Sequence, residues 1–564
     1  MLATTGTRES MHGRTRLWRR VVLLSVVGLA VLVAACGRGF INYAELRRFE
    51  RSEHFRLPVI FIPGAKGSQL VDRDGDAIWG VSGEVALWGR FRRLAFDYER
   101  IIEDDPHRFA DHYADRGVYP RDVLLAYALG QRWFVFHKFI VYRDLRDFLV
   151  KEGQYVYRSD RGVSLFLFPY DWRLDNRVAA VKLAMQLPVF RAEYDRLLRF
   201  EYCKRKKKGP CSQDEVAGIA DEFQRYLADM RTRHPHLFTT REGPPQVRFH
   251  IIAHSMGGLV AHYFLTRLDG DRDVGQFVTI GVPTKGAMDA LKAVVEGEYP
   301  DTLFSTVFGG LFYTRKATTY ISASFPSIFQ VLPRYDAAVT GIDLADLGLH
   351  GSPSELTSAR LEEIVRVFET YGGLPDARGT AKALGRAEPV PISAIRRHFA
   401  AQLLSAACFH GTLDAELTSE SERLCAEDER IRRIVRFLQR AYRDRPHDLN
   451  LAAAPDVEAR LKARPSAPVQ RRHVYGGHCT RTLSRARFQR EPEPRIVFLT
   501  TSGEGQSELY YGDGRVPFES AQFRRPKEAW VNSFFLCADH VDLVKDDSFK
   551  YNLLRALLSP LNER

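Results

Sequence analysis

The chain has 564 residues, 45% of them hydrophobic and 27% charged, and its 82 Lys and Arg against 70 Asp and Glu give a net charge of +12. This composition is that of a globular protein, because a disordered chain holds fewer apolar residues. Only one apolar run stands out, which excludes a protein that spans a membrane several times. The length allows several average domains, or one large domain with insertions.

The first 36 residues predict a signal peptide of the bacterial lipoprotein type. A positive stretch, Arg14–Arg20, precedes the apolar run Val21–Ala35. This run is shorter than the about 20 residues of a transmembrane helix and is typical of a signal peptide. Leu32–Gly37 resembles a lipobox, in which cleavage leaves an acylated N-terminal Cys36. A plain secretory signal and an uncleaved anchor are the alternatives, and all three export the rest of the chain.

Acylation of Cys36 predicts where the protein works. The exported chain is expected at the bacterial cell envelope, anchored on the periplasmic side of the inner or outer membrane. The membrane surface is then a partner, because acyl chains on one Cys insert into the bilayer. No protein partner is predicted.

The positive charge is unevenly spread along the chain. Residues 1–36 carry +4, from five Arg and Glu9, and five positive charges of the remainder form the run Lys204–Lys208. Because a nucleic-acid-binding protein has a more pervasive basic character, no nucleic-acid partner is expected. The run predicts a solvated loop, with a site for an anionic partner as the alternative.

Strands that alternate with helices predict an α/β fold with a mostly parallel central sheet. Helical patterns cover Val178–Phe200 and Glu215–Arg231, between two of the predicted strands. The six stretches that predict strands are Pro58–Ile62, Ser164–Phe168, Val247–Ala253, Gln276–Ile280, Arg495–Thr500 and Trp530–Leu536.

Residues 291–490 interrupt this rhythm and predict an inserted, mainly helical cap. Helical patterns occur at Ser358–Tyr371 and Glu420–Tyr442, and no buried strand is evident. The Arg-rich stretch Pro465–Arg490 is poorly periodic and predicts a loop. The predicted domains are the signal peptide at 1–36, the first part of the core at 37–290 with a possible lid insertion at about 75–140, the cap at 291–490 and the second part of the core at 491–564.

The third predicted strand leads into the segment Ala253–Gly257, which has the pattern of a nucleophile elbow. In G-x-S-x-G the Ser lies on a tight turn between a strand and a helix. The residues two before and two after it, Ala253 and Gly257, have little side chain because this turn is crowded. The amides that begin the helix point toward the reacting oxygen. Ser255 is therefore the predicted nucleophile, and a Ser in an ordinary strand–helix turn is the alternative.

A nucleophilic Ser needs a base and a carboxylate that orients it, and in α/β-hydrolases the chain order is Ser, acid, His. Asp513 lies between two Gly after a late predicted strand, which suits the acid, and Glu519 is the fallback. His540 is the only His that follows Asp513, so it is the predicted base. His254, next to the nucleophile, is expected to serve in packing.

The oxyanion hole requires two backbone N–H donors. The amide of Met256, directly after the nucleophile, predicts one of them. The loop Pro63–Ser68 after the first strand predicts the other, at Ala65. A P-loop would place Lys after the second Gly, whereas Lys66 precedes Gly67, so nucleotide binding is disfavoured. This chemistry needs no cofactor.

Export also affects how the Cys residues are expected to pair. Six Cys in an oxidising compartment can form three disulfides, and free buried Cys are the alternative. Without CxxC or HExxH motifs, no metal site is predicted. The shortest loops favour the pairs Cys203–Cys211 and Cys408–Cys425, which leaves Cys479–Cys537.

Several motifs together resemble the lecithin:cholesterol acyltransferase family, which includes group XV phospholipase and phospholipid:diacylglycerol acyltransferase. The resemblance implies an α/β-hydrolase fold with a cap and a lid, and an acyl-enzyme on Ser255. It implies the same triad and oxyanion residues that the pattern predicts. The motifs are Pro63–Leu70, Pro169–Arg173, Ala253–Gly258, Thr279–Gly286, Pro326–Pro333 and Gly512–Pro517.

The chain also departs from the family pattern. No counterpart of the short disulfide-closed lid of animal members is evident, and Trp79 and Trp88 are the candidates to mark that region. No resemblance extends over residues 335–490.

The predicted function is that of a serine lipase, phospholipase or acyltransferase acting on lipid esters. The aromatic stretch Leu303–Tyr313 fits an acyl groove or interface, and equally the core of the cap. Two other functions remain open: an esterase for small non-lipid esters, and a catalytically silent binding module.

Overall fold

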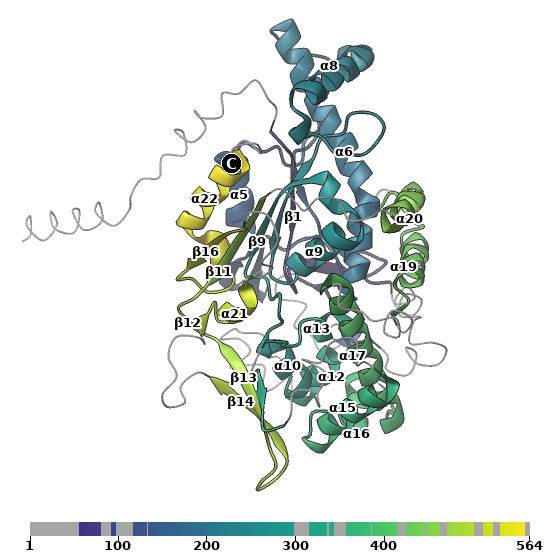
Figure 1. Cartoon of the computed structure of the whole chain (residues 1–564), viewed down its shortest axis with the longest axis vertical. Coiled ribbons are helices and arrows are strands. Elements are labelled where there is room, and N and C mark those ends of the chain that lie inside the picture. Colours follow the sequence, from purple (N-terminus) through teal and green to yellow (C-terminus); the bar gives the residue numbers. More distant parts are fainter. Residues whose placement is uncertain are drawn as a thin grey trace, which may run out of the picture. The chain divides into compact units, whose positions relative to one another are not determined.

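The computed structural model describes residues 56–80, 92–96, 117–131, 134–297, 315–335, 338–342, 357–384, 386–414, 425–445, 448–462, 471–500, 511–522 and 531–558. They belong to one unit, Glu53–Arg564 (Figure 1). The predicted signal peptide with Cys36, the lid candidate Trp88 and the aromatic stretch 303–313 lie outside the described residues.

A six-stranded sheet, parallel throughout, forms the centre of the fold. The strands β1, β8 and β9 are buried at every position, as expected for a parallel sheet covered on both faces. This confirms the predicted fold class. The order across the sheet is β16 (Val531–Leu536), β11 (Arg471–Gly477), β9 (Val274–Ile280), β8 (Phe249–His254), β1 (Val59–Ile62) and β7 (Leu165–Leu167).

One predicted strand lies in a different sheet from the one expected, and the loop predicted at Pro465–Arg490 was wrong. Arg495–Thr500 is β14, which pairs antiparallel with β13 (Leu483–Gln489) in a separate small sheet with β10 (Val339–Thr340). The place in the central sheet belongs to β11, inside the stretch that was predicted to be a loop. The strand begins with the polar residues Arg472 and His473, which are both buried. Because such residues are usually exposed, the pattern does not indicate a buried strand. The chain thus returns to the central sheet before residue 490, the predicted end of the cap.

Helices cover both faces of the central sheet (Figure 1). On one face, α6 (Asn176–Lys207) packs against α9 (Gly257–Arg267). On the other face, α22 (Asp547–Leu558) packs against α5 (Arg143–Lys151). Aromatic rings join these helices to the strands, for example Phe549 of α22 with Tyr475 of β11 at 4.9 Å between centroids.

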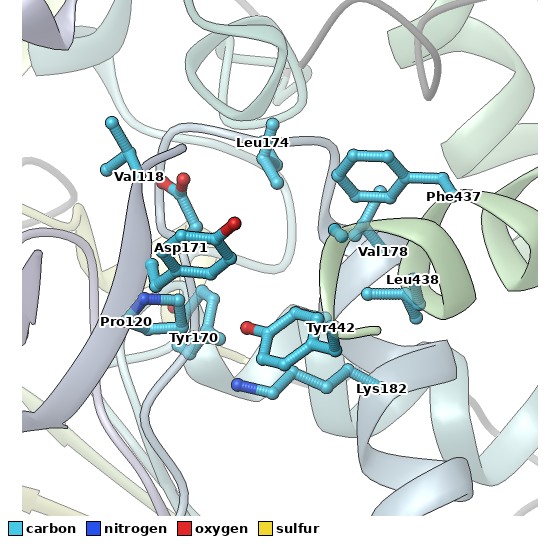
Figure 2. Close-up of a pocket in the computed structure, with 13 residues that line it drawn as sticks. Val118, Pro120, Tyr170, Asp171, Leu174, Val178, Lys182, Phe437, Leu438 and Tyr442 are labelled. Atoms are coloured by element: carbon cyan, nitrogen blue, oxygen red, sulfur yellow. The ribbon is translucent and has the colours of Figure 1, made fainter. Parts of the chain in front are cut away.

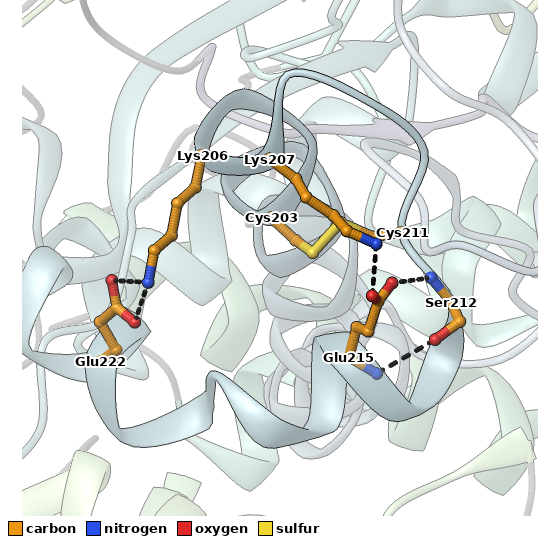
Figure 3. Close-up of a disulfide and its surroundings, with 7 residues drawn as sticks. All are labelled: Cys203, Lys206, Lys207, Cys211, Ser212, Glu215 and Glu222. Carbon is orange, nitrogen blue, oxygen red and sulfur yellow. Dashed lines mark hydrogen bonds and ion pairs between the residues drawn. A yellow bond between two sulfur atoms is a disulfide. The ribbon is translucent and has the colours of Figure 1, made fainter.

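The basic run Lys204–Lys208 lies mainly at the end of a helix, not in a loop (Figure 3). Positive side chains at a helix C-terminus interact favourably with its dipole. Lys206 lies 2.6 Å from Glu222 of α8 (Ala220–Arg233). Lys207 forms an ion pair with Glu215, which also completes the capping box of α7 (Gln213–Gly218) with Ser212. Local partners therefore neutralise part of the run.

Three disulfides join the six Cys of the described residues in the pairing that the sequence favoured. Cys203–Cys211 closes the turn after α6 (Figure 3). Cys408–Cys425 links α17 (Ile392–Asp414) to the residues before α19 (Glu427–Ala441). Cys479–Cys537 joins the segments that follow β11 and β16, and it thereby holds the loop that leads to His540.

The residues between β9 and β11 are mainly helical where the structure describes them. Part of them builds a second apolar core, in which Phe368 and Phe399 pack with Phe488 of β13. The helices are α10 (Met288–Val295), α12 (Arg315–Ser322), α13 (Pro326–Phe329), α15 (Ser358–Thr370), α16 (Ala377–Leu384), α17, α19 and α20 (Ala454–Lys462).

The possible lid insertion at 75–140 contains short strands. β2 (Ser68–Val71) pairs antiparallel with β3 (Ala77–Trp79) and with β4 (Tyr119–Val123). Two further strands, β5 (Ala126–Gln131) and β6 (Phe134–Ile140), form an antiparallel pair that leads into α5. This part of the chain thus borders the loop at 63–68.

A buried carboxylate, Asp273, fastens helix α20 to the core. Arg460 of α20 contacts it at 2.6 Å, Arg241 at 3.0 Å, and Arg191 of α6 also pairs with it. The side chains of Asp273 and Arg460 are 0% and 1% exposed. Burial alone would raise the pKa of Asp273, but the Arg side chains outweigh it and hold the pKa below its usual range.

We expect Asp273→Asn to lower the free energy of unfolding by about 3–5 kcal/mol, because it leaves buried Arg side chains without their counter-charge. Urea unfolding followed by circular dichroism measures this change. The control is Asp542→Asn, which removes an exposed ion pair to Lys545 and should cost less than about 1 kcal/mol. Equal losses in both variants would contradict a fastening role for Asp273.

A small pocket lies between β4, α6 and α19 (Figure 2). Its walls include Val178, Phe437 and Tyr442, and Lys182 lies at one end. The ammonium group of Lys182 donates to the Pro169 carbonyl at 3.0 Å and lies 5.1 Å from the centre of the Tyr442 ring. Burial lowers the pKa of Lys182 from 10.5 to about 8, against the opposing effect of nearby carboxylates.

Because of this lowered pKa, the free-energy cost of burying the charged Lys182 side chain depends on pH. The folded chain binds the proton of Lys182 more weakly than the unfolded chain, so the folded state loses stability as the pH falls from about 10.5 to about 8. Between pH 7 and pH 10, the free energy of unfolding of the wild type should rise relative to Lys182→Met by roughly 2–3 kcal/mol. Urea unfolding of both proteins across this range measures the difference. A difference that does not vary with pH would contradict the prediction.

Candidate active site

Ser255 lies between β8 and α9, with φ of +52°. This left-handed conformation is strained for a residue with a side chain, and such strain is typical of functional turns. The amide of Ser255 donates to the Ile280 carbonyl at 2.8 Å, which fixes the turn to the end of β9. A Cβ on Gly257 would lie 2.3 Å from the Pro63 carbonyl oxygen. The Gly is thus required by the loop after β1, in addition to the turn itself.

Asp513 and His540 lie together as predicted for an acid and a base. His540 Nδ1 lies 2.7 Å from Asp513 Oδ2, and the Asp513 side chain is fully buried. The other carboxylate oxygen accepts the amides of Arg515 and Val516 at 3.0 and 2.7 Å. Glu519, the fallback for the acid, instead lies 3.7 Å from Lys285.

The Asp513–His540 pair lies at the carboxyl end of β9, the strand beside β8. A Cβ on Gly281, directly after β9, would lie 2.8 Å from Asp513 Oδ2 and 2.9 Å from His540 Nδ1. His254, the residue before Ser255, has its ring centroid 4.7 Å from that of His540. The elbow and the acid–base pair therefore lie at the same edge of the sheet, where ligands of open α/β sheets bind.

The loop at 63–68 lies directly against Ser255. A Cβ on Gly64 would lie 2.7 Å from the Ser255 Cβ and 3.3 Å from its Oγ. The amide of Gly67 donates to the Gly64 carbonyl at 3.0 Å and closes a turn around Ala65 and Lys66. Within the described residues, no acceptor takes the amide hydrogen of Ala65 or Met256, the two predicted oxyanion donors. The Gly64 amide is occupied, because it donates to the Tyr142 hydroxyl at 3.0 Å.

Two aromatic residues, Tyr170 and Trp79, hold this loop in place. Tyr170 donates its hydroxyl to the Pro63 carbonyl at 3.0 Å, and its amide donates to Ser68 Oγ at 3.1 Å. Trp79, a candidate marker of the lid, donates its indole N–H to the Lys66 carbonyl at 2.9 Å. Trp79 therefore contacts the loop that carries the predicted oxyanion donor.

His254 has a more specific environment than the packing role that was expected. Its Nδ1 lies 2.8 Å from the Tyr142 hydroxyl, and its Nε2 lies 3.0 Å from the His540 carbonyl oxygen. Burial, and next the charge that His540 can carry, lower the pKa of His254 to about 3. Tyr142, directly before α5, was not singled out from the sequence, because no local motif marks it.

No group of three or more His, Cys, Asp or Glu side chains among the described residues is arranged to hold a metal ion. In the same stretches, every helix is too short or too polar to cross a membrane.

The comparisons with known proteins place part of the chain in a family. A family model described as lecithin:cholesterol acyltransferase matches residues 236–370. A solved structure titled "The crystal structure of Tle4-Tli4 complex" is similar with a TM-score of 0.45 and 12% identity, over 90% of this chain and 98% of that chain. None of the curated proteins matches the chain.

The matched segment contains the elbow at Ser255 and two further motifs, Thr279–Gly286 and Pro326–Pro333. Asp513 and His540 lie outside the match, on the returning part of the α/β core. The resemblance inferred from the motifs is thereby confirmed. The segment 236–370, which carries the nucleophile elbow, matches the model of the lecithin:cholesterol acyltransferase family, and it lies in a chain with an α/β fold around a parallel central sheet.

Proposed function

We propose that this protein is a serine hydrolase or acyltransferase that takes a fatty acyl group from lipid esters through an acyl-enzyme on Ser255. The observation that carries the proposal is the buried Asp513–His540 pair at 2.7 Å, beside a strained Ser on a nucleophile elbow. Nucleophile, base and orienting acid are the three groups that acyl transfer by Ser requires.

The proposed cycle uses each group in turn. Ser255 Oγ attacks the ester carbonyl while His540 Nε2 takes its proton. Asp513 accepts the Nδ1–H of His540, and it thus fixes the tautomer and stabilises the imidazolium that forms. Its second oxygen is already held by two backbone amides, so the carboxylate keeps its orientation. His540 then protonates the leaving alcohol, and later activates the water or alcohol that receives the acyl group.

The amides of Ala65 and Met256 are proposed to bind the tetrahedral oxyanion. Both lie next to Ser255, one on the loop after β1 and one at the start of α9. Donors held in place before the reaction stabilise the developing charge without reorganisation, and each contributes about 3 kcal/mol. Tyr170 and Trp79 support this role, because they hold the carbonyls on either side of Ala65.

A lipid ester is proposed as the substrate because the matched family is named for acyl transfer from lecithin. The predicted acylation of Cys36 would place the enzyme at the cell envelope next to such esters, and both the anchor and this location belong to the proposal. An esterase for small esters and a silent binding module are the rival outcomes of the experiment.

We expect Ser255→Ala to abolish turnover, and Asp513→Asn to lower kcat by about 10⁴-fold because His540 loses its orienting acceptor. Phospholipid vesicles and nitrophenyl esters with long and short chains are the substrates, and a fluorophosphonate probe reports the nucleophile. Asp542→Asn, an exposed carboxylate near His540 in sequence, serves as the control. Labelling that survives Ser255→Ala would identify a different nucleophile. A preference for short chains would favour the esterase, and absence of both turnover and labelling would favour the binding module.

Gly64→Ala should lower kcat by more than about 100-fold, because the added Cβ would push the loop away from Ser255 and displace the Ala65 amide. Gly218→Ala is the matched control, since nothing lies within 4 Å of its added Cβ. Steady-state kinetics and thermal unfolding of both variants separate lost activity from lost folding. Full activity of Gly64→Ala would show that this loop does not supply an oxyanion donor.

A further inference from the structure

We infer that Tyr142 and His254 are positioning residues that connect the oxyanion loop to the catalytic base. The inference rests on the proposed function, since it concerns the same site. Three hydrogen bonds form one continuous path between the two halves of that site. The Gly64 amide lies 3.0 Å from the Tyr142 hydroxyl, which lies 2.8 Å from His254 Nδ1, and His254 Nε2 lies 3.0 Å from the His540 carbonyl oxygen.

The chemistry of the two ends fixes the direction of every bond in the path. The Gly64 amide can only donate and the His540 carbonyl can only accept. The His254 Nε2 must therefore carry a hydrogen, so Tyr142 donates its hydroxyl hydrogen to Nδ1 of a neutral imidazole. Burial raises the pKa of Tyr142 against the opposing effect of the Gly64 amide, and burial lowers the pKa of His254 to about 3. The path is therefore uncharged at neutral pH, and it holds the loop at Gly64 and the backbone of His540 in a fixed relative position.

At the His540 end, the path completes the fixation of the base. The amide of His540 donates to the Asp513 carbonyl at 2.7 Å, and its Nδ1 contacts the Asp513 carboxylate. His254 holds the carbonyl of the same residue, so the backbone of His540 is held on both sides of its Cα. The rings of His254 and His540 are also in contact.

At the other end, the path holds the loop that carries the oxyanion donor. Tyr142 takes the amide of Gly64, the residue before Ala65, and the amide of Ala65 remains available. His254 is the last residue of β8, directly before Ser255. The proposed nucleophile, base and oxyanion donor are therefore all positioned relative to the end of the buried strand β8.

A test must distinguish this role from simple packing of the Tyr142 ring. That ring lies 4.9 Å from the ring of Phe61 and 5.6 Å from the ring of His254. Tyr142→Phe keeps these contacts and removes only the hydroxyl. His254→Gln offers an acceptor and a donor in the same sense as the imidazole, whereas His254→Leu offers neither.

The experiment measures kcat and KM of the full chain with a long-chain nitrophenyl ester. In Tyr142→Phe and His254→Leu, kcat should fall about 10- to 100-fold while KM stays within about twofold, because bound substrate meets a misplaced base and donor. His254→Gln should recover most of the loss. The double variant Tyr142→Phe/His254→Leu should be no slower than the slower single variant, because both break the same path.

Tyr194→Phe is the matched control, since it removes a buried hydroxyl that bonds the Arg56 carbonyl, before the amino end of β1. It should lower the thermal stability as Tyr142→Phe does and leave kcat unchanged. An active wild type with unchanged kcat in Tyr142→Phe and His254→Leu would overturn the inference and leave the proposed function intact. A wild type that turns over no ester and is not labelled at Ser255 would overturn both.

Discussion

The close packing of the loop at 63–68 against Ser255 is the constraint on which the rest of the site depends. Gly64 faces the side chain of Ser255, and Gly257 faces the Pro63 carbonyl, at distances that leave no room for a Cβ. Two backbone segments can approach so closely only where both carry hydrogen in place of a side chain. The approach brings an amide of the loop after β1 next to Ser255, the proposed nucleophile, in the turn after β8.

The remaining structure holds this approach in place from several directions. Tyr170 and Trp79 bond the carbonyls of the loop, and Tyr142 bonds its first Gly amide. Each comes from a different part of the chain, so the loop is fixed by tertiary contacts and not by its own sequence. A site built in this way is arranged before substrate binds, which is what electrostatic stabilisation of a transition state requires.

The sequence predicted the parts of this arrangement that have local signatures. The apolar strands before turns, the crowded elbow and the Gly-flanked Asp513 are visible in short stretches, and the order of Ser, acid and His followed from the fold. β11 was not predicted because its first residues are Arg and His. These side chains are buried in the sheet, but no hydrophobic periodicity indicates it. Tyr142 was not predicted because its partners Gly64 and His254 are 78 and 112 residues away in the sequence, and only folding brings them together.

The disulfide between Cys479 and Cys537 couples the chemistry of the site to the compartment in which the protein folds. It joins the segments after β11 and β16, and Cys537 lies three residues before the proposed base His540. Such a bond forms in an oxidising compartment and stays open in a reducing cytosol. If the chain is exported as proposed, the bond would form only after secretion. The redox state of the surroundings would then set when the loop of the proposed base is covalently fixed.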